Sequence, residues 1–327
     1  MLLYIFKRIL GMIPLLIGIT LISFVVVSLA PGNPAQFLSS MNPKISETAY
    51  EKFIKMYELD KPVLERYWVW LKRFVRFDFG NSFASDQQPV IKKIKDKLPI
   101  TIYLNVTSML LIVLFSIPIG VFSAVYKNSL FDKITTVIVF IGFAVPTFWL
   151  ALLLMYYFGV IHGWLPISSL TSYNFNELSI AGKINDILWH SILPVGITIF
   201  GGVAGFSRYV RSSMLDVLNE EYITAALSRG VKKRSVIFKH ALRNALLPTI
   251  TIIGLSIPGL IGGSVIFESV FSIPGMGQLF YQSVMMRDYP VIMGILVIGA
   301  ILTLFGNLIA DISYSIADPR IRYGNKK

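Results

Sequence analysis

The sequence predicts an all-α membrane protein with six transmembrane helices, and three observations carry this prediction. Of the 327 residues, 54% are hydrophobic and only 15% are charged. The mean hydropathy of +0.67 is too high for a soluble domain, whose surface must stay polar. The apolar residues also gather in runs of about 20 residues, the length that a helix needs to cross a hydrocarbon core of about 30 Å.

We expect six such spans, and the first is expected to be retained. It begins after Lys7 and Arg8 as a signal peptide would, but it is longer than a signal peptide and lacks a small-residue cleavage pattern. The expected spans are 9–30, 100–126, 134–161, 187–206, 245–267 and 291–312.

The distribution of Lys and Arg predicts that both termini are cytoplasmic. A cluster of these residues lies between Arg208 and Arg243, whereas the two short loops on the opposite side carry one each, Lys183 and Arg287. Short cytoplasmic loops are enriched in Lys and Arg. This asymmetry accounts for most of the net charge of +12, so no nucleic-acid partner is predicted.

Residues 31–98 are predicted to form a mostly helical extracytoplasmic cap after the first span. They are polar, carry both signs of charge and contain two helix-like stretches, SETAYEKFIKMYELD and ERYWVWLKRFVRF. The aromatic residues of the second stretch leave an amphipathic element on the lipid surface as an alternative. The predicted domains are the N-terminal helix 1–30, the cap 31–98, a five-helix transmembrane domain 99–317 with a cytoplasmic loop 212–244, and a cytoplasmic tail 318–327.

The spans lack the residues that proton-coupled carriers use. Between their ends the only Asp, Glu, Lys, Arg or His residues are His190, near the start of the fourth span, and Asp311, at the end of the sixth, and Glu268 lies just past the fifth span. Proton relays need such groups at membrane depth. Sodium coupling through unwound helices stays open, because prolines occur in several spans, although proline is also ordinary in transmembrane helices. The prolines are Pro118, Pro146, Pro194 and Pro258.

No motif for catalysis or nucleotide binding is evident. Gly182 and Lys183 lack the upstream glycine and the following Ser or Thr of a phosphate-binding loop. The three histidines are scattered, and there is no cysteine. The sequence therefore predicts no catalytic residue, no metal site and no cofactor in this chain, and a membrane-embedded hydrolase is disfavoured.

A basic segment separates the fourth and fifth spans, EEYITAALSRGVKKRSVIFKHALRNALLP, residues 220–248. Residues 221–229 are predicted to form a short helix on which Ala225 and Ala226 leave a smooth face. Gly230 is placed to end that helix in a left-handed conformation. Lys232 and Arg234 are expected to face the cytoplasm. A topology signal beside anionic lipid is the alternative.

This segment resembles the "EAA" loop in the membrane subunits of binding-protein-dependent ABC importers. Ala225, Ala226 and Gly230 match the first half of that motif, while Thr224 stands where the general pattern has Glu, and Glu221 is expected to replace that acid. A Leu-Pro pair, residues 247–248, falls five residues later than in the general pattern, as in the dipeptide, oligopeptide and nickel branch. In that family a short coupling helix docks on a cytoplasmic ATPase. The resemblance therefore implies a set of ATPase-coupling residues, namely Glu221, Ala225, Ala226, Gly230, Lys232 and Arg234.

The resemblance extends over nearly the whole chain and is closest to the first of the two permeases in that branch. It includes PLLIGITLISFVVVSLAPGNP, YELDKPVLERYWVWL, VPTFWLALLLMYYFG, FESVFSIPGMGQLFYQSVMMRDYP and ADPRIRYG. The resemblance implies a permease that passes di- or oligopeptides by alternating access in a bacterial or archaeal cytoplasmic membrane. Nickel, a metal chelate or an oligosaccharide is the alternative substrate, and a sodium-coupled secondary carrier is the alternative class.

The same resemblance implies the partners. They are a homologous second permease, one or two ATPase subunits that bind ATP and Mg²⁺, and an extracytoplasmic substrate-binding protein.

One further segment, GGSVIFESVFSIPGMGQLF, is a candidate outer gate, because its glycines and proline predict a compact turn after the fifth span. An ordinary interfacial loop is the alternative. The candidate gate residues are Glu268, Phe271, Pro274, Gly275 and Gly277.

Overall fold

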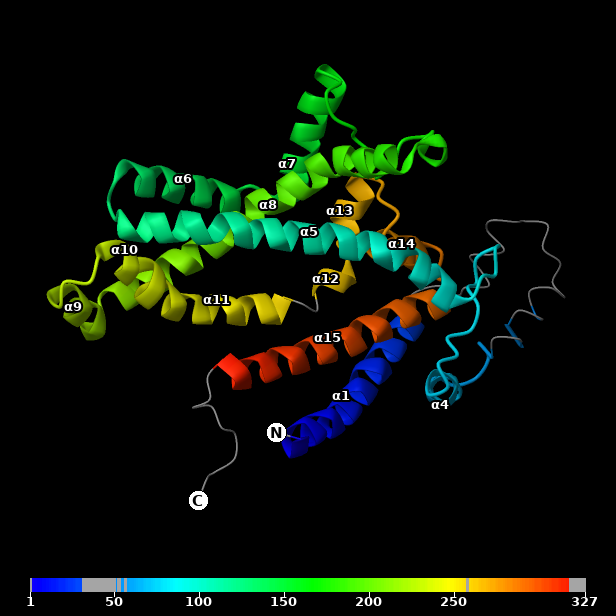
Figure 1. Cartoon of the computed structure of the whole chain (residues 1–327). Helices are drawn as coiled ribbons and strands as arrows, with labels where there is room; N and C mark the ends of the chain where they lie inside the picture. Colours follow the sequence, from blue (N-terminus) through cyan, green and yellow to red (C-terminus); the bar gives the residue numbers. More distant parts are fainter. Residues whose placement is uncertain (1, 31–50, 52–53, 56–57, 257–258, 318–327) are drawn as a thin grey trace. The chain divides into compact units, whose positions relative to one another are not determined.

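A computed structural model describes residues 2–30, 51, 54–55, 58–256 and 259–317 (Figure 1). Within these ranges the regular structure is helical, apart from an isolated β-bridge between Asn81 and Pro89. The all-α class is therefore confirmed. The predicted tail 318–327, most of residues 31–57 of the predicted cap, and Pro258 lie outside the described residues.

Five of the described helices are long and apolar enough to cross a membrane, and a bent pair adds a sixth span if it is counted as one. This agrees with the expected number. The five are Ile5–Leu29, Val90–Val125, Ile180–Leu218, Lys233–Ser256 and Tyr289–Ile309. The placement of both termini in the cytoplasm stays a prediction from the charge pattern.

The expected span 134–161 is not one straight helix. It consists of helix α6 (Leu130–Ala144) and helix α7 (Thr147–Leu154), and a π-helical turn η1 (Met155–Ile161) continues α7. The axes of the two helical parts differ by 98°. The bend lies at Pro146, which has no N–H to donate, and at Val145, whose φ of −88° and ψ of 119° are extended, as is usual before proline.

The expected span 245–267 is also interrupted. Helix α11 (Leu242–Ser256) is followed by two short helices, α12 (Gly259–Gly262) and α13 (Val265–Val270). Between the short helices Gly263 has a φ of +67°, which a helix cannot continue and which glycine adopts without a Cβ clash.

The described residues divide into two compact units. The chain passes from the first unit to the second inside helix α5 (Val90–Val125), and it changes unit again between residues 260 and 274. The first unit contains α1 (Leu2–Leu29), α4 (Val63–Phe74), α14 (Met276–Met285) and α15 (Tyr289–Ala317). Helix α1 packs along α15 and contacts α4. Its core gathers buried side chains from α5, α14 and α15, namely Val90, Ile94, Met276, Leu279, Val291, Met293, Ile295 and Val297, together with Phe79.

The second unit is a bundle in which α8 (Ile180–Leu218) contacts α6, α7 and α11. Small residues let α5 lie close to α8. A Cβ added at Gly120 would lie 2.6 Å from the Cβ of Val210 and 2.7 Å from the carbonyl oxygen of Ser207. Side chains larger than glycine are excluded there, and such close backbone approach is the usual basis of helix packing in membranes. The packing fixes the end of α8, from which the basic segment continues.

Candidate coupling surface

The basic segment begins with a short helix, α9 (Glu221–Ser228), which two residues separate from the end of α8. Its single buried side chain is Ile223, which is 2% exposed. Ile223 packs in a cluster with residues from the neighbouring helices of the same unit, namely Val121, Ala124, Val210, Met214, Val236, Ile237, Ala241 and Ala245. The helix therefore lies on the end of the bundle, held by one apolar anchor.

Outside this anchor the surface of α9 is open. Glu221, Tyr222, Ala225 and Leu227 are all exposed. Glu221 lies in the first turn, where a negative charge is favourable beside the helix N-terminus. This surface thus offers an aromatic, an aliphatic and an acidic group around one small residue, and Ala225 leaves room for the close approach of another protein.

Gly230 ends α9 in the manner expected from the sequence. Its φ is +80°, its N–H donates to the carbonyl of Leu227 at 2.9 Å, and the N–H of Val231 donates to the carbonyl of Ala226 at 3.2 Å. This pair of bonds is a Schellman motif, which satisfies two helix-end carbonyls. Ala226 and Val231 pack on the same buried cluster as Ile223, so the motif also has its usual apolar contact.

The chain returns to the bundle through a second helical segment. Helix α10 (Lys233–Ser235) and a π-helical turn η3 (Val236–Ala241) lead into α11. Lys232, Lys233 and Arg234 are exposed, and none of the carboxylates in the described ranges forms an ion pair with them. The Asn244 amide donates to the Tyr222 hydroxyl at 2.8 Å and joins α11 to α9. The predicted coupling residues 221–234 thus lie together on one connected surface.

A buried ion pair supports the bundle and was not predicted from the sequence. Asp132 is 4% exposed and accepts from Arg211 twice, from Nε at 2.7 Å and from Nη2 at 2.9 Å. The Ser123 hydroxyl donates to the same carboxylate at 2.6 Å, and the Asn128 N–H donates at 2.9 Å. Because Arg211 lies on α8 two turns before its end, the pair links the start of α6 to the helix that carries α9.

Part of this arrangement had a signal in the sequence. Ser129 caps α6, and its hydroxyl accepts from the Asp132 N–H at 3.2 Å. Ser followed by an acid three residues later is a helix-start signature. Its partner Arg211 had no such signal, because the contact between α6 and α8 joins residues 79 positions apart.

The candidate gate residues fall in two groups. Glu268 and Phe271 belong to the second unit and are 3% and 2% exposed. The turn after α13 is closed by the Ile273 N–H, which donates to the Glu268 carbonyl at 2.8 Å. The Phe271 carbonyl accepts from the Ser169 N–H at 2.8 Å. The first bond folds the turn back on its own helix, and the second joins the turn to the loop that contains Ser169.

Pro274, Gly275 and Gly277 belong to the first unit. Gly275 precedes α14, and a Cβ at Gly277 would lie 2.7 Å from the backbone of Ser264 and Val265. Gly277 is therefore required for the close crossing of two backbone segments. The gating role of both groups stays a prediction.

In the part of the chain that the structure describes, no group of three His, Cys, Asp or Glu side chains is arranged to hold a metal ion. His190 has a local partner instead. Its Nδ1 lies 2.8 Å from the carbonyl oxygen of Asp186 and 3.4 Å from its carboxylate.

Comparison with known proteins gives matches over nearly the entire chain. Residues 116–323 match the family described as binding-protein-dependent transport system inner membrane component, and residues 1–105 match the N-terminal region of the same type of protein. The oligopeptide transport system permease protein AppB of Bacillus subtilis is 47% identical over 320 residues, with 98% of this chain and 99% of the relative covered.

Two further relatives are more distant in sequence but equally complete. The glutathione transport system permease protein GsiC of Salmonella choleraesuis is 36% identical over 99% of this chain and 100% of its own length. The inner membrane ABC transporter permease protein YejB of Escherichia coli O157:H7 is 35% identical, with 98% of each chain covered. A chain of the inward-facing MetNI methionine ABC transporter, 18% identical, matches the fold with a TM-score of 0.55 over 70% of this chain and 97% of that chain.

Proposed function

The chain belongs to the binding-protein-dependent transport system inner membrane components, and on that premise we propose that it forms half of the pathway of an ATP-driven importer for di- or oligopeptides. Membership makes it a multi-pass membrane transport component rather than an enzyme, in a system with an ATPase and a binding protein. The observation that carries the peptide assignment is the identity of 47% to an oligopeptide permease along the whole chain.

In this proposal a second, homologous permease supplies the other half of the pathway. One or two ATPase subunits bind ATP and Mg²⁺ on the cytoplasmic side, and an extracytoplasmic binding protein delivers the peptide. Alternating access within residues 99–317 then moves the peptide across a bacterial or archaeal cytoplasmic membrane. Residues 31–98 contact the binding protein or shield the pore, and the segment around Glu268 acts as the outer gate.

Helix α9 transmits the motion in this scheme. It is held to the bundle by Ile223, ends rigidly at Gly230 and leaves Glu221, Ala225 and Leu227 exposed. A rigid element with two docked positions converts ATPase closure into rotation of the bundle. The basic residues Lys232 and Arg234 flank this docking surface.

The test is reconstitution of the complete transporter in proteoliposomes with its binding protein. We expect uptake of a labelled di- or tripeptide, including glutathione, that requires internal ATP and the binding protein. Uptake of nickel or an oligosaccharide in place of peptides would refute the peptide assignment. Uptake that follows a sodium gradient without ATP would refute the importer mechanism.

A further inference from the structure

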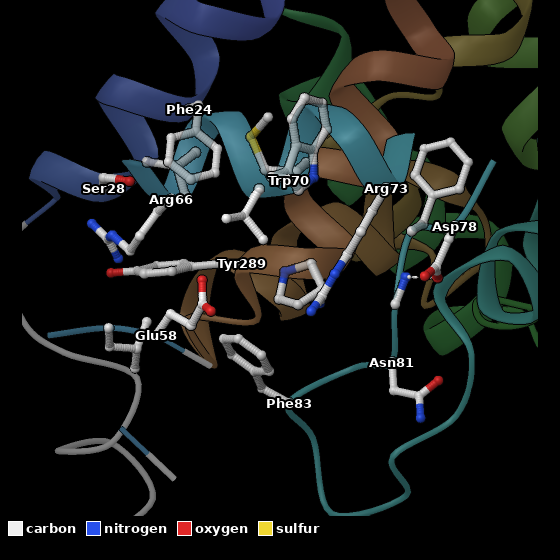
Figure 2. Close-up of a pocket in the computed structure, with 17 residues that line it drawn as sticks. Phe24, Ser28, Glu58, Arg66, Trp70, Arg73, Asp78, Asn81, Phe83 and Tyr289 are labelled. Atoms are coloured by element: carbon white, nitrogen blue, oxygen red, sulfur yellow. Dashed lines mark hydrogen bonds between the residues drawn. The ribbon is translucent and has the colours of Figure 1, made fainter. Parts of the chain in front are cut away.

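The first unit contains a cavity of about 150 Å³ that the proposed transport pathway does not use (Figure 2). It is lined by the end of α1, by α4, by residues 78–83 and by the start of α15. For scale, a dry cavity of about this size in another protein holds one benzene ring. The cavity is therefore large enough for one small group of a ligand whose remainder lies outside.

Two arginines of α4 reach into this cavity. Figure 2 shows Arg66 and Arg73 extending from the helix among the lining residues. The Arg66 Nε is buried and has no hydrogen-bond partner in the described part of the chain. A buried donor without a partner costs free energy, and the group that relieves this cost must accept a hydrogen bond.

The two acids that line the cavity already have other partners. Glu58 accepts from Lys61 at 2.9 Å, and Asp78 accepts from the Gly80 N–H at 2.9 Å. Lys61 therefore compensates the charge of Glu58, and the neutral Gly80 N–H occupies an oxygen of Asp78, whereas neither arginine forms an ion pair with a described carboxylate. The cavity thus favours an anion. A guanidinium presents parallel N–H groups that match the two oxygens of a carboxylate or phosphate.

The remaining wall is aromatic. The Phe24 ring lies 5.6 Å from the ring of Tyr67 and 6.0 Å from that of Trp70, and Trp70 stacks on Phe74 at 5.3 Å. Tyr67 is fixed by a hydrogen bond of 3.1 Å between its hydroxyl and that of Thr20. A ligand in the cavity would therefore meet both rigid aromatic rings and arginine donors.

The position of the cavity points to a membrane lipid. Phe24 and Ser28 lie in the last turns of the span Ile5–Leu29, which is the depth of the lipid headgroups. Helix α4 also has an exposed apolar stripe, in which Leu64, Trp68 and Val75 are 62%, 61% and 70% exposed. Arg66 and Arg73 lie on the opposite face of the same helix, and a helix with one apolar and one basic face is typical of the membrane interface.

From these observations we propose that the cavity binds the phosphate of a phospholipid headgroup. Arg66 donates to the phosphate oxygens, Arg73 adds a second positive charge, and the wall of Phe24 and Trp70 contacts the glycerol and the upper acyl chain. The bound lipid fixes α4 against α1, independently of which substrate the pore carries.

The experiment measures binding of dioctanoyl phosphatidylglycerol to the purified transporter complex, by native mass spectrometry and by the shift in melting temperature. We expect saturable binding to the wild type and an affinity about 10- to 100-fold lower for Arg66→Gln. Arg66→Lys keeps the charge but not the paired donors, so its affinity should fall between the two. Lys72→Gln, an exposed residue of α4 outside the cavity, is the matched control and should bind like the wild type.

Inorganic phosphate and octanoate distinguish the sources of the anion. If either competes with the lipid at equal concentration, the site is one for a small free anion and the lipid assignment is overturned. If Arg66→Gln and Arg66→Lys both bind the lipid as tightly as wild type, or if the wild type shows no saturable binding, the proposal fails. If Arg66→Gln does not assemble, the wild-type competition experiments and the affinity of Arg66→Lys for the lipid still test the proposal.

Discussion

Among single residues, Gly230 and Asp132 are constrained for different physical reasons. Gly230 adopts a φ that side chains with a Cβ rarely adopt, yet a Cβ there would meet no atom within 4 Å. Any penalty for substitution is thus backbone strain and not a clash. At Asp132 the constraint comes instead from the surroundings. Burying its carboxylate costs free energy, and four hydrogen bonds from neighbouring groups offset that cost.

Substitution of Gly230 by a β-branched residue should uncouple the transporter. Gly230→Val forces a left-handed conformation at about 1 to 2 kcal/mol or opens the Schellman turn, which reorients α9. Gly230→Asn tolerates this conformation better and should retain more activity. The measurements are co-purification of the ATPase, peptide uptake and ATP turnover in the reconstituted complex.

Lys232→Gln is the control, because it removes only an exposed charge and should change little. If Gly230→Val assembles and transports like the wild type, while neutralising Lys232, Lys233 and Arg234 scrambles the membrane topology, then the segment is a topology signal and not a coupling element.

The Asp132–Arg211 pair should respond unequally to removal of its two partners. Arg211→Met leaves the nearly buried Asp132 carboxylate without its cation, so we expect a loss of about 3 to 5 kcal/mol in stability. Asp132→Asn leaves Arg211, whose side chain is 31% exposed, in reach of water and should cost less. Thermal unfolding of both single variants and the double variant gives the coupling energy. Equal effects of the two single changes would contradict this account.

At the scale of elements, α9 is a helix of eight residues that is too short to be stable alone and depends on one anchor. Its attachment therefore rests on Ile223, on the Schellman turn and on the bond from Asn244 to Tyr222. The buried Ile223 and the exposed Leu227 thus differ in their surroundings, so attachment of the helix and docking on its surface can be tested separately.

Shortening the anchor should loosen α9 without removing its exposed side chains. Ile223→Ala truncates a fully buried side chain, which typically costs about 2 to 5 kcal/mol of stability. Here the substitution weakens the attachment of α9 to the bundle. We expect ATP hydrolysis to lose its stimulation by binding protein and peptide, while the ATPase still co-purifies partly. Leu227→Ala, which shortens an exposed side chain of α9, should instead weaken ATPase co-purification. Identical phenotypes for the two variants would argue against this division.

The interrupted helix α12–α13 is the second element with a functional prediction. If the turn after α13 gates the pathway, Glu268→Ala should alter peptide uptake and the ATPase activity stimulated by the binding protein, because it changes a side chain buried in that helix. Glu268→Gln retains the shape and tests the charge alone. Uptake and stimulated ATPase activity at wild-type levels in the alanine variant would show that Glu268 has no part in a gate.

At the scale of the whole molecule, the expected topology places residues 31–98 outside and α9 inside. Because the sequence contains no cysteine, a single introduced cysteine is the only thiol in this chain that a labelling reagent can modify. Ser85→Cys should react with an impermeant thiol reagent added outside intact cells, and Ser46→Cys, at a position outside the described residues, should do the same. Ser228→Cys, on the exposed side of α9, should react only after the membrane is opened. The reverse labelling pattern would show that the orientation in the membrane is opposite to the predicted one.

The all-α membrane class, the number of spans and the left-handed end at Gly230 could all be predicted from the sequence. These features depend on composition, on run length and on the missing Cβ of glycine, all of which are local. The tertiary structure decided the 98° bend at Pro146, the break at Gly263, the pairing of Asp132 with Arg211 and the cavity around Arg66. Proline and glycine permit a bend without requiring one, and which outcome occurs depends on the neighbouring helices. A contact between residues 79 positions apart likewise exists only when the packing of α6 on α8 brings them together.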